Sequence, residues 1–487
     1  MGASAPAEEI PKELEAMAGE AMRQAASSLS DARPRSYWLD DPERPEPLPA
    51  LTGDERCDLL VVGGGYSGLW TALLAKERDP GREVVLVEGH EVGWAASGRN
   101  GGFCAASLTH GLANGADRWP DEIAELEELG ERNLDAIEET LVRYGIRCDF
   151  ERTGEIDVAT RPHELAGLRA WHRRTEEMGL GRTDFLDRDQ VRAEIDSPAF
   201  LGGLWDRRGV AMLHPAKLAW GLKRACLGLG VRVFENTRAL GLARSGPGVA
   251  VRTPYGRVLA RRVALGTNVF PSLVRRLRPY TVPVYDYALM TEPLNAGQLA
   301  SIGWRNRQGI GESAHRFHYF RLSADNRILW GGYDAVYPFG GRLNSALDQR
   351  PETFLTLAGQ FFTYFPQLSG LRFSHAWGGA IDTCSRFSAF FGTALRGRVS
   401  YAAGYTGLGV GATRFGAEVM LDLLAGEPTG RTALTMVRSK PLPFPPEPFA
   451  WAGIGLTKRS LARADRHGGH RDLWLRTMDR MGFGFDS

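Results

Sequence analysis

The sequence lacks the features that would direct it to a membrane, to nucleic acid or to a disulfide framework. Its 487 residues include five cysteines, an odd number, and none of them stands in a CxxC pair. No apolar run reaches the roughly 18 residues that a membrane-spanning helix requires, and no basic stretch followed by an apolar one opens the chain. Basic and acidic residues nearly cancel, at 59 and 58. We expect a cytoplasmic protein with reduced thiols that binds neither membranes nor nucleic acid.

The hydrophobic pattern of the chain is that of an α/β protein. Its 487 residues are too many for one hydrophobic core, so we predict two or more domains. Continuous apolar strands alternate with helical stretches in three separate parts of the chain, as in a parallel sheet. Between them, runs such as 154–159 indicate an antiparallel sheet. We predict an α/β fold with a Rossmann-like domain of residues 54–115, 206–275 and 376–430, a discontinuous α+β domain of residues 116–205 and 276–375 built on an antiparallel sheet, and extensions of residues 1–53 and 431–487. The extension after residue 440 is expected to be peripheral.

A glycine motif follows the first apolar strand and opens a helical stretch. Gly63, Gly65 and Gly68 satisfy GxGxxG. The first glycine permits a tight turn, the second lets the backbone approach a pyrophosphate, and the third allows close packing of the helix. Glu88 ends the next strand about 20 residues later, where its carboxylate can accept hydrogen bonds from a ribose. The motif predicts a dinucleotide site that also includes Tyr66 and Ser67.

A second glycine-rich turn lies about 340 residues further on, again between an apolar strand and a helix. It contains Gly404, Thr406, Gly407, Leu408 and Gly409. A flavin dinucleotide is longer than one mononucleotide pocket, and a second helix N-terminus at the pyrimidine end of the flavin would stabilise negative charge on the reduced ring. There is no second complete GxGxxG with an acidic partner to hold NADPH. The two turns together favour FAD.

With these motifs the chain resembles the D-amino-acid oxidase and glycine oxidase superfamily of FAD-dependent oxidoreductases, most closely its γ-glutamylputrescine oxidase-like branch. The resemblance runs from about residue 37 to about residue 430, and its further marks are the segments 96–102, 265–268, 328–333 and 377–379. It implies that the Rossmann-like domain binds FAD and that the antiparallel sheet of the substrate domain covers the flavin. Some relatives attach FAD to a cysteine, but Cys384 falls several residues after that position, so we expect FAD to be bound non-covalently.

The resemblance also implies an activity. The branch oxidises a C–N bond of an amine or amino acid by transferring a hydride to flavin N5, and water then hydrolyses the imine. Oxygen usually reoxidises the flavin and yields hydrogen peroxide. The partners are then a small-molecule substrate and oxygen, and the chain is a monomer or a homodimer. The alternatives are a tailoring oxidoreductase acting on a larger biosynthetic intermediate, and a binding protein that retains FAD without catalysis.

Cofactor contacts carry over to matching positions. Gly63, Gly65, Ser67 and Gly68 are expected at the pyrophosphate, Glu88 at the ribose and Val233 on the adenine side. Gly266, which ends another apolar strand, is also expected to contact the cofactor. The flavin ring is expected to border Ser97, Gly98, Asn100, Gly101 and Gly102, and its pyrimidine end the turn from Gly404 to Gly409.

Three residues are candidates for catalysis. Tyr319 lies on the strand that carries a substrate-facing tyrosine in sarcosine-oxidase-like relatives. Trp330 aligns with a lysine that in those relatives holds a water over the flavin, which predicts weak reactivity with oxygen unless the indole only packs above the ring. The third is Arg99. Some relatives place a carboxylate-clamping arginine just after the Ser-Gly segment, but Gly101 and Gly102 occupy that place here, so the clamp is expected to be absent, with Arg99 and Arg321 as its candidate substitutes. The substrate is therefore expected to be an amine held by shape and aromatic contact.

His315 and His318 would point to opposite faces of a strand, so no metal site is expected.

Overall fold

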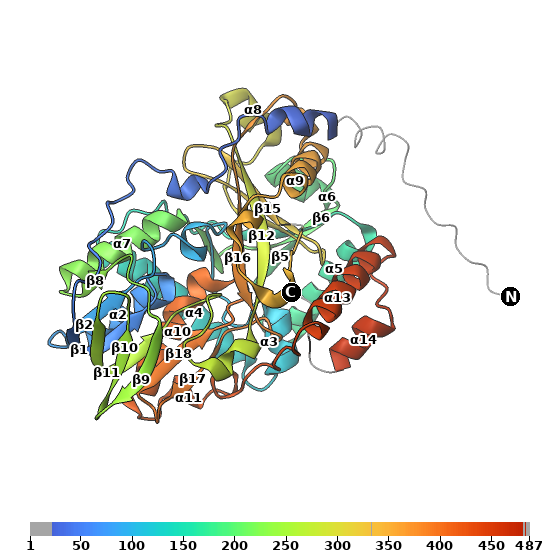
Figure 1. Cartoon of the computed structure of the whole chain (residues 1–487). Helices are drawn as coiled ribbons and strands as arrows, with labels where there is room; N and C mark the ends of the chain where they lie inside the picture. The colour runs from blue at the N-terminus through green and yellow to red at the C-terminus, as the bar shows by residue number, and fades with distance from the viewer. Residues whose placement is uncertain (1–21, 333, 481–482, 484–487) are drawn as a thin grey trace.

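The computed structural model describes residues 22–332, 334–480 and 483. Residues 1–21 of the predicted N-terminal extension and Tyr333 of the resemblance lie outside the described residues. Two large sheets lie side by side in the molecule (Figure 1). The site is built between them.

The first sheet is mainly parallel, because β1 pairs in parallel with β2 and β11, β2 with β8, and β11 with β18. Its order is β17-β18-β11-β1-β2-β8, and β9 and β10 add an antiparallel pair beside β11. The strands are β1 (Glu55–Val62), β2 (Val84–Val87), β8 (Arg232–Phe234), β9 (Gly241–Ser245), β10 (Gly248–Arg252), β11 (Arg257–Leu265), β17 (Phe390–Ala394) and β18 (Val399–Ala403). Packed on this sheet are α2 (Tyr66–Arg78), α7 (Pro215–Gly228) and α10 (Gly409–Ala425). The predicted α/β class with a Rossmann-like unit is confirmed.

The second sheet has the order β16-β12-β15-β14-β13-β4-β6-β5 and is antiparallel except between β13 and β4. Its strands are β4 (Glu155–Ala159), β5 (Thr183–Leu186), β6 (Gly202–Asp206), β12 (Val282–Thr291), β13 (Gly309–Glu312), β14 (His318–Leu322), β15 (Ile328–Gly332) and β16 (Phe373–Thr383). One face packs against α9 (Pro351–Tyr364) through an aromatic core. The other face turns toward β3 (Phe103–Ala105) and β7 (Val210–Met212), which form a small sheet of their own.

Helix α4 (Ile123–Arg143) packs on the side of the first sheet. Its apolar stripe, which includes Leu126, Leu134 and Ile137, joins the same buried cluster as α2 and α10. The predicted substrate domain includes this helix, and the division into domains remains a prediction. Further helices are α3 (Leu112–Arg118), α5 (Pro162–Glu177), α6 (Arg188–Glu194), α8 (Ala296–Ile302), α11 (Gly430–Ala433) and α12 (Thr435–Arg438).

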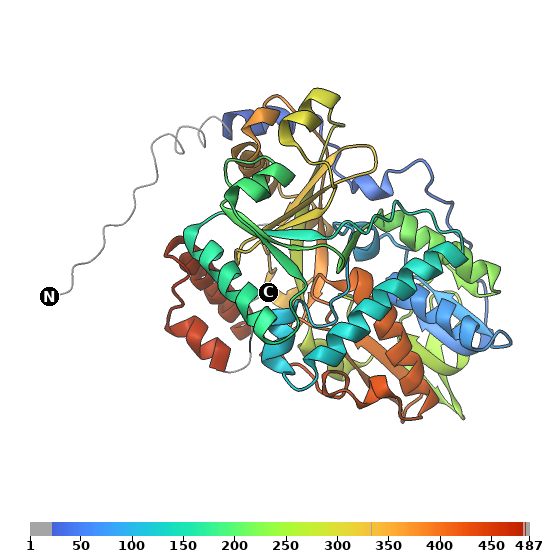
Figure 2. The same cartoon turned by 180° about the vertical axis from the view of Figure 1, so that it is seen from behind.

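The C-terminal extension is a structural part of the molecule and not the peripheral tail that its composition suggests. Helices α13 (Phe449–Arg466) and α14 (Leu473–Arg480) lie beside α5 (Figures 1 and 2). The Arg161 guanidinium donates to the carbonyl of Asp465 at 2.5 Å, and the Lys458 ammonium lies 3.3 Å from the Asp334 carboxylate. These contacts could not be predicted from the sequence, because a segment rich in proline and arginine resembles a solvent-exposed tail. None of the helices in the described ranges is long and apolar enough to cross a membrane.

Candidate functional site

The first glycine turn has the geometry of a phosphate cradle. Gly63 has a φ of +110°, and a Cβ there would lie 2.4 Å from the carbonyl oxygen of Gly266. A Cβ on Gly68 would lie 1.8 Å from the carbonyl oxygen of Gly63, so both positions require glycine. Gly65 caps α2, and its missing side chain leaves the backbone open at the helix N-terminus. The residues present therefore fit the pyrophosphate of a dinucleotide.

Glu88 lies directly beside this turn. Its Oε2 accepts a hydrogen bond from the Gly64 N–H at 2.6 Å, and its Oε1 accepts from the His90 N–H at 2.9 Å. Burial raises the pKa of Glu88 above its ordinary value. Val233 lies on β8, next to β2, and its side chain belongs to the buried core. If Val233 contacts adenine as predicted, it does so through its backbone. The predicted contact of Glu88 with the ribose of the cofactor stays a prediction.

The segment 96–102 forms a loop between the first turn and the second sheet. The Asn100 Nδ2 donates to the carbonyl of Ala96 at 2.9 Å, and its Oδ1 accepts from the Gly102 N–H at 2.8 Å. Ser97 Oγ accepts from the Tyr66 N–H at 3.0 Å and so ties the loop to the start of α2. A Cβ on Gly101 would lie 2.7 Å from the Tyr319 ring, so this glycine allows the loop to approach β14 closely. Of the predicted flavin contacts, Ser97, Gly98, Asn100, Gly101 and Gly102 thus lie in one continuous loop.

The second glycine turn leads into α10, and Asp382 closes it from β16. The Asp382 Oδ2 accepts from the Gly404 N–H at 2.6 Å, and its Oδ1 accepts from Asn268 Nδ2 at 3.3 Å. Gly404 and Thr406 have positive φ angles of +76° and +51°. Burial raises the pKa of Asp382 to about 7. Asp382 was not predicted from the sequence, although an isolated acid near the end of an apolar strand is a signal of such a role.

We expect the stability of the flavin-free protein to fall as the pH rises from about 3.8 to about 7. The Asp382 carboxyl has a pKa of about 7 in the fold against an ordinary 3.8, so its contribution is fully present below about pH 3.8 and is lost as the pH rises through its folded value. Asp382→Asn cannot ionise and should flatten this part of the profile. Unfolding midpoints measured at about pH 5.5 and about pH 8.5 provide the check. Equal pH dependence in the two proteins would show that Asp382 does not titrate in this range.

Cys384 lies against the second turn, but its thiol is engaged. The sulfur donates to the carbonyl oxygens of Ser388 at 3.2 Å and Gly404 at 3.4 Å. Burial raises the pKa of this thiol, which keeps it protonated at neutral pH. Because the thiolate is the nucleophilic form, these contacts agree with non-covalent binding of the cofactor.

A cavity of about 1580 Å³ joins these loops to the second sheet and to the C-terminal helices. Ser97 and Gly101 line it from the loop, and Thr406 and Gly407 from the second turn. Phe444 and Phe449 line it from the C-terminal extension. The cavity is therefore closed on one side by a segment whose role the sequence did not indicate.

Tyr319 and Asp286 form a hydrogen-bonded pair on the cavity-facing side of the second sheet. The Tyr319 hydroxyl donates to Asp286 Oδ2 at 2.6 Å. Burial raises the pKa of both groups, Tyr319 well above its ordinary value, so the hydroxyl keeps its proton. Tyr319 also packs edge-on against Phe103, at 5.8 Å between ring centroids. The prediction placed Tyr319 in the substrate pocket, and the structure brings it to the cavity wall beside Gly101.

Two further carboxylates share this face of the sheet. Tyr319 pairs with Gly311 and Gly311 with Asp157, and directly paired residues point to the same side. Glu155 lies two positions away on the same strand, and both side chains line the cavity. In the described ranges neither carboxylate has a hydrogen-bond or ion-pair partner. Burial raises the pKa of both, and their mutual proximity adds to the shift of Glu155. Neither residue was identified from the sequence.

The two candidate arginines are committed to the protein. The Arg99 Nη1 lies 2.6 Å from Asp348 Oδ2, and its Nε donates to the carbonyl of Trp94 at 3.0 Å. Arg321 is 1% exposed, and its Nη1 donates to the carbonyl of Leu213 at 2.6 Å. Burial lowers the pKa of Arg321 to about 10. Arg99 lines the cavity with its guanidinium paired to Asp348, so its role in catalysis stays a prediction.

Trp330 does not lie above the cofactor loop, contrary to the prediction. It pairs with Phe320, and it is Gly331 that pairs with Tyr319, so the indole points to the opposite face of the sheet. There it is 0% exposed, stacks on His318 at 4.5 Å and contacts the aromatic side chains of α9. Placing Trp330 on this strand was correct. Which of its residues face the cavity could not be predicted, because Gly331 and Gly332 carry no side chain that would indicate the face.

His315 and His318 have separate partners. His315 Nδ1 lies 2.8 Å from Asp465 Oδ1 of α13, whereas His318 Nδ1 lies 2.6 Å from Glu312 Oε2. The described part of the chain contains no group of three or more His, Cys, Asp or Glu side chains that could hold a metal ion.

Comparison with protein families matches residues 58–423 to the model described as FAD dependent oxidoreductase, DAO. The gamma-glutamylputrescine oxidoreductase of Escherichia coli is 31% identical over 418 residues, which cover 84% of this chain and 93% of that protein. The probable oxidoreductase OrdL of Haemophilus influenzae is 27% identical over 404 residues, which cover 81% of this chain and 88% of that protein.

Solved structures share the fold. The glycine oxidase of Bacillus cereus has a TM-score of 0.65 at 17% identity and covers 79% of this chain and 99% of its own. An L-amino acid deaminase of Proteus vulgaris has a TM-score of 0.61 at 18% identity, with 83% of this chain and 97% of its own covered.

Proposed function

Because the chain belongs to the DAO family of FAD-dependent oxidoreductases, we propose that it oxidises a carbon–nitrogen bond of an amine or amino acid, with amines preferred. The chain is thus an enzyme whose cofactor is FAD. The gamma-glutamylputrescine oxidoreductase relative supports an amine substrate. We propose oxygen as the final electron acceptor, with hydrogen peroxide as the product.

The observation that carries the preference for amines is the pair of acidic side chains on the cavity wall. Asp157 and Glu155 face the cavity without partners in the described ranges, as stated above. Each described arginine or lysine that lines the cavity is engaged by a neighbouring group, as Arg182 is by Glu127 at 2.5 Å. These carboxyl groups can accept hydrogen bonds from an amine, whereas a substrate carboxylate meets no uncommitted arginine or lysine among the described residues of this wall.

The residues of the chain orient the substrate and exclude water. When bound, FAD supplies the two-electron acceptor for oxidation of the C–N bond. The Tyr319 hydroxyl holds its proton toward Asp286, so the pair presents a fixed dipole beside Gly101. Phe103 and Phe444 supply apolar walls that limit the access of water. Such a pocket favours a neutral amine at the reacting carbon.

An anaerobic bleaching screen tests the proposal. Amines and α-amino acids, each acid paired with its decarboxylated analogue, are mixed with the purified protein, and the flavin absorption band is followed. We expect the amines to bleach the flavin at least as fast as the parent acids. A strict requirement for the α-carboxylate would overturn the preference for amines. Bleaching by dithionite alone would overturn the oxidase function itself.

A tailoring reaction on a larger intermediate is the second candidate. The cavity of about 1580 Å³ exceeds the upper end of ordinary ligand pockets, about 1,000 Å³, and part of that space is needed for the cofactor. Its extension to the C-terminal helices leaves space beyond the Tyr319 wall. A substrate screen that includes amines with bulky apolar substituents distinguishes this candidate, because only the second function requires the added group for bleaching.

We expect Tyr319→Phe to slow bleaching by the best amine by roughly 10- to 100-fold while FAD stays bound. The change removes the hydrogen bond to Asp286 and leaves a buried carboxyl without its donor, which costs about 1–3 kcal/mol. Tyr364→Phe is the matched control, because it also removes a hydroxyl bound to a carboxylate, that of Glu312 on the opposite face of the sheet. Single-turnover bleaching rates at saturating substrate give the comparison. Equal bleaching rates in the parent and in Tyr319→Phe would show that the Tyr319 hydroxyl takes no part in the reaction.

A further inference from the structure

A short N-terminal segment holds the loop 96–102 from outside. The Ser36 hydroxyl donates to the carbonyl of Gly98 at 2.9 Å, and Trp38 Nε1 donates to the carbonyl of Asn100 at 2.9 Å. Ser36 is 4% exposed and Trp38 is 1% exposed. We propose that residues 36–41, called the strap below, position this loop for FAD, with Trp38 as the central positioning residue. The proposal rests on the placement of the flavin beside the loop.

Three consecutive carbonyls of the loop are held in this way. Between the two strap contacts, the carbonyl of Arg99 accepts a hydrogen bond from Trp377 Nε1 at 2.9 Å. The peptide groups of the loop cannot rotate without leaving a buried carbonyl unpaired, which is costly. The loop therefore keeps its shape before the cofactor arrives, and the entropy lost on binding is smaller.

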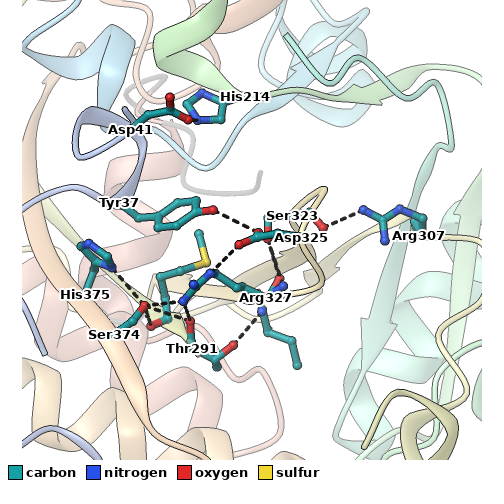
Figure 3. A network of polar contacts seen from close by, with 12 residues as sticks. Tyr37, Asp41, His214, Thr291, Arg307, Ser323, Asp325, Arg327, Ser374 and His375 are labelled. Carbon is teal, nitrogen blue, oxygen red and sulfur yellow. Dashed lines mark hydrogen bonds and ion pairs between the residues drawn. The ribbon is translucent and has the colours of Figure 1, made fainter. Parts of the chain in front are cut away.

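The strap is itself fastened to the second sheet (Figure 3). The Tyr37 hydroxyl donates to Asp325 Oδ1 at 3.0 Å, and the same carboxylate accepts from the Arg327 Nε at 2.6 Å. Asp40 Oδ2 lies 3.1 Å from His375 Nε2 on β16. Figure 3 shows Tyr37 between Asp325 on one side and His375 on the other. These anchors connect the strap to the turn between β14 and β15 and to β16.

A second set of contacts fastens the strap to the start of α7, a helix that packs on the first sheet. Asp41 Oδ2 lies 3.4 Å from His214 Nε2 and 3.4 Å from Lys217 Nζ, at the start of α7. The Trp38 ring packs edge-on against the His214 ring at 4.8 Å. The strap thus contacts the second sheet, the start of α7 and the loop 96–102. A structural anchor alone would need the outer contacts, but it would not need the two donors that face the loop.

The test compares two buried indoles that both donate to a backbone carbonyl. Trp38→Phe keeps an aromatic ring beside His214 and removes the N–H. Trp304→Phe is the control, because Trp304 is 4% exposed and donates to the carbonyl of Gln308 at 3.1 Å in the core of the second sheet. FAD is removed and titrated back, and the dissociation constant and visible spectrum are measured with the unfolding midpoint of each flavin-free protein.

We expect Trp38→Phe to weaken FAD binding by roughly ten-fold and to change the shape of the flavin band, since one loop carbonyl loses its donor. Trp304→Phe should lower the unfolding midpoint without changing FAD affinity. Ser36→Ala should weaken FAD binding in the same direction, and it carries the test if Trp38→Phe does not fold. FAD affinities equal to the parent's in Ser36→Ala and Trp38→Phe would overturn the proposal. The amine screen is independent of this outcome, so either proposal can fail alone.

Discussion

Gly65→Ala should give a folded protein that has lost most of its affinity for FAD. The backbone at Gly65 has a φ of −82°, which any L-residue adopts, and the added Cβ would meet only the Ser97 hydroxyl, at 3.0 Å. The fold therefore tolerates the methyl group at a cost below about 1 kcal/mol. The same methyl occupies the space where a pyrophosphate must approach the backbone of α2. We expect the dissociation constant for FAD to rise on the order of 100-fold, or about 2.8 kcal/mol.

A substitution at Gly65 distinguishes an effect on FAD binding from an effect on folding better than one at a neighbouring glycine does. A Cβ on Gly68 would lie 1.8 Å from the Gly63 carbonyl oxygen, so that substitution would disturb the turn itself. Gly167→Ala is the matched control, because nothing lies within 4 Å of its added Cβ in α5. The control should keep FAD and gain slightly in stability from the better helix propensity of alanine. Flavin occupancy after purification and an FAD titration provide the measurement. Full occupancy in Gly65→Ala would place the pyrophosphate elsewhere.

The phosphate cradle could be predicted because its requirements are local. The positive φ of Gly63 and the close approach of Gly68 follow from a tight turn between a strand and a helix, and both leave a glycine signature at fixed spacing. The same holds for the second turn, where Gly404 has a positive φ. The interrupted α/β pattern likewise follows from hydrophobic periodicity, which each segment carries by itself.

The substrate side of the site depends on contacts that no local pattern encodes. The bond from Trp38 to the Asn100 carbonyl spans 62 positions, and nothing in either segment indicates the partner. Asp157 reaches the cavity only because β4 pairs with β13 in one particular register. The apolar residues of α13 lie among basic ones, and their place on the cavity wall depends on the docking of the helix against α5.

Strand register also explains the error at Trp330. A shift of one residue moves a side chain to the other face of a sheet, and Gly331 and Gly332 offer no side chain by which to judge the face. The cavity-facing position next to Tyr319 belongs to Gly331. The expectation of weak oxygen reactivity consequently loses its link to the indole. Arg321 lies two positions beyond Tyr319 on the same face and donates to the carbonyls of Gly102 and Leu213, so this face does carry a cation beside the cofactor loop.

Trp330→Lys should therefore destabilise the protein and should not accelerate the reaction of the reduced flavin with oxygen. The indole is 0% exposed, and its ring lies 4.8 Å from that of Phe320 and 5.2 Å from that of Tyr364. Lysine would lose this packing and would place an ammonium group in an aromatic core, at a cost of about 4 kcal/mol or more. We expect a fall of the unfolding midpoint of about 4 °C or more, or a loss of soluble protein.

Trp330→Phe keeps the test informative if the lysine variant does not fold. It retains an apolar ring in the core and should lower stability by less, while its reoxidation rate should equal the parent's because the ring faces α9 and not the cofactor loop. The flavin is reduced anaerobically and mixed with aerated buffer, and reoxidation is followed by stopped flow. An accelerated rate in a folded Trp330→Lys protein would mean that the lysine reaches the flavin and that the strand faces the other way. A rate unchanged in Trp330→Phe, together with a lower unfolding midpoint, would leave Trp330 with a role in packing alone.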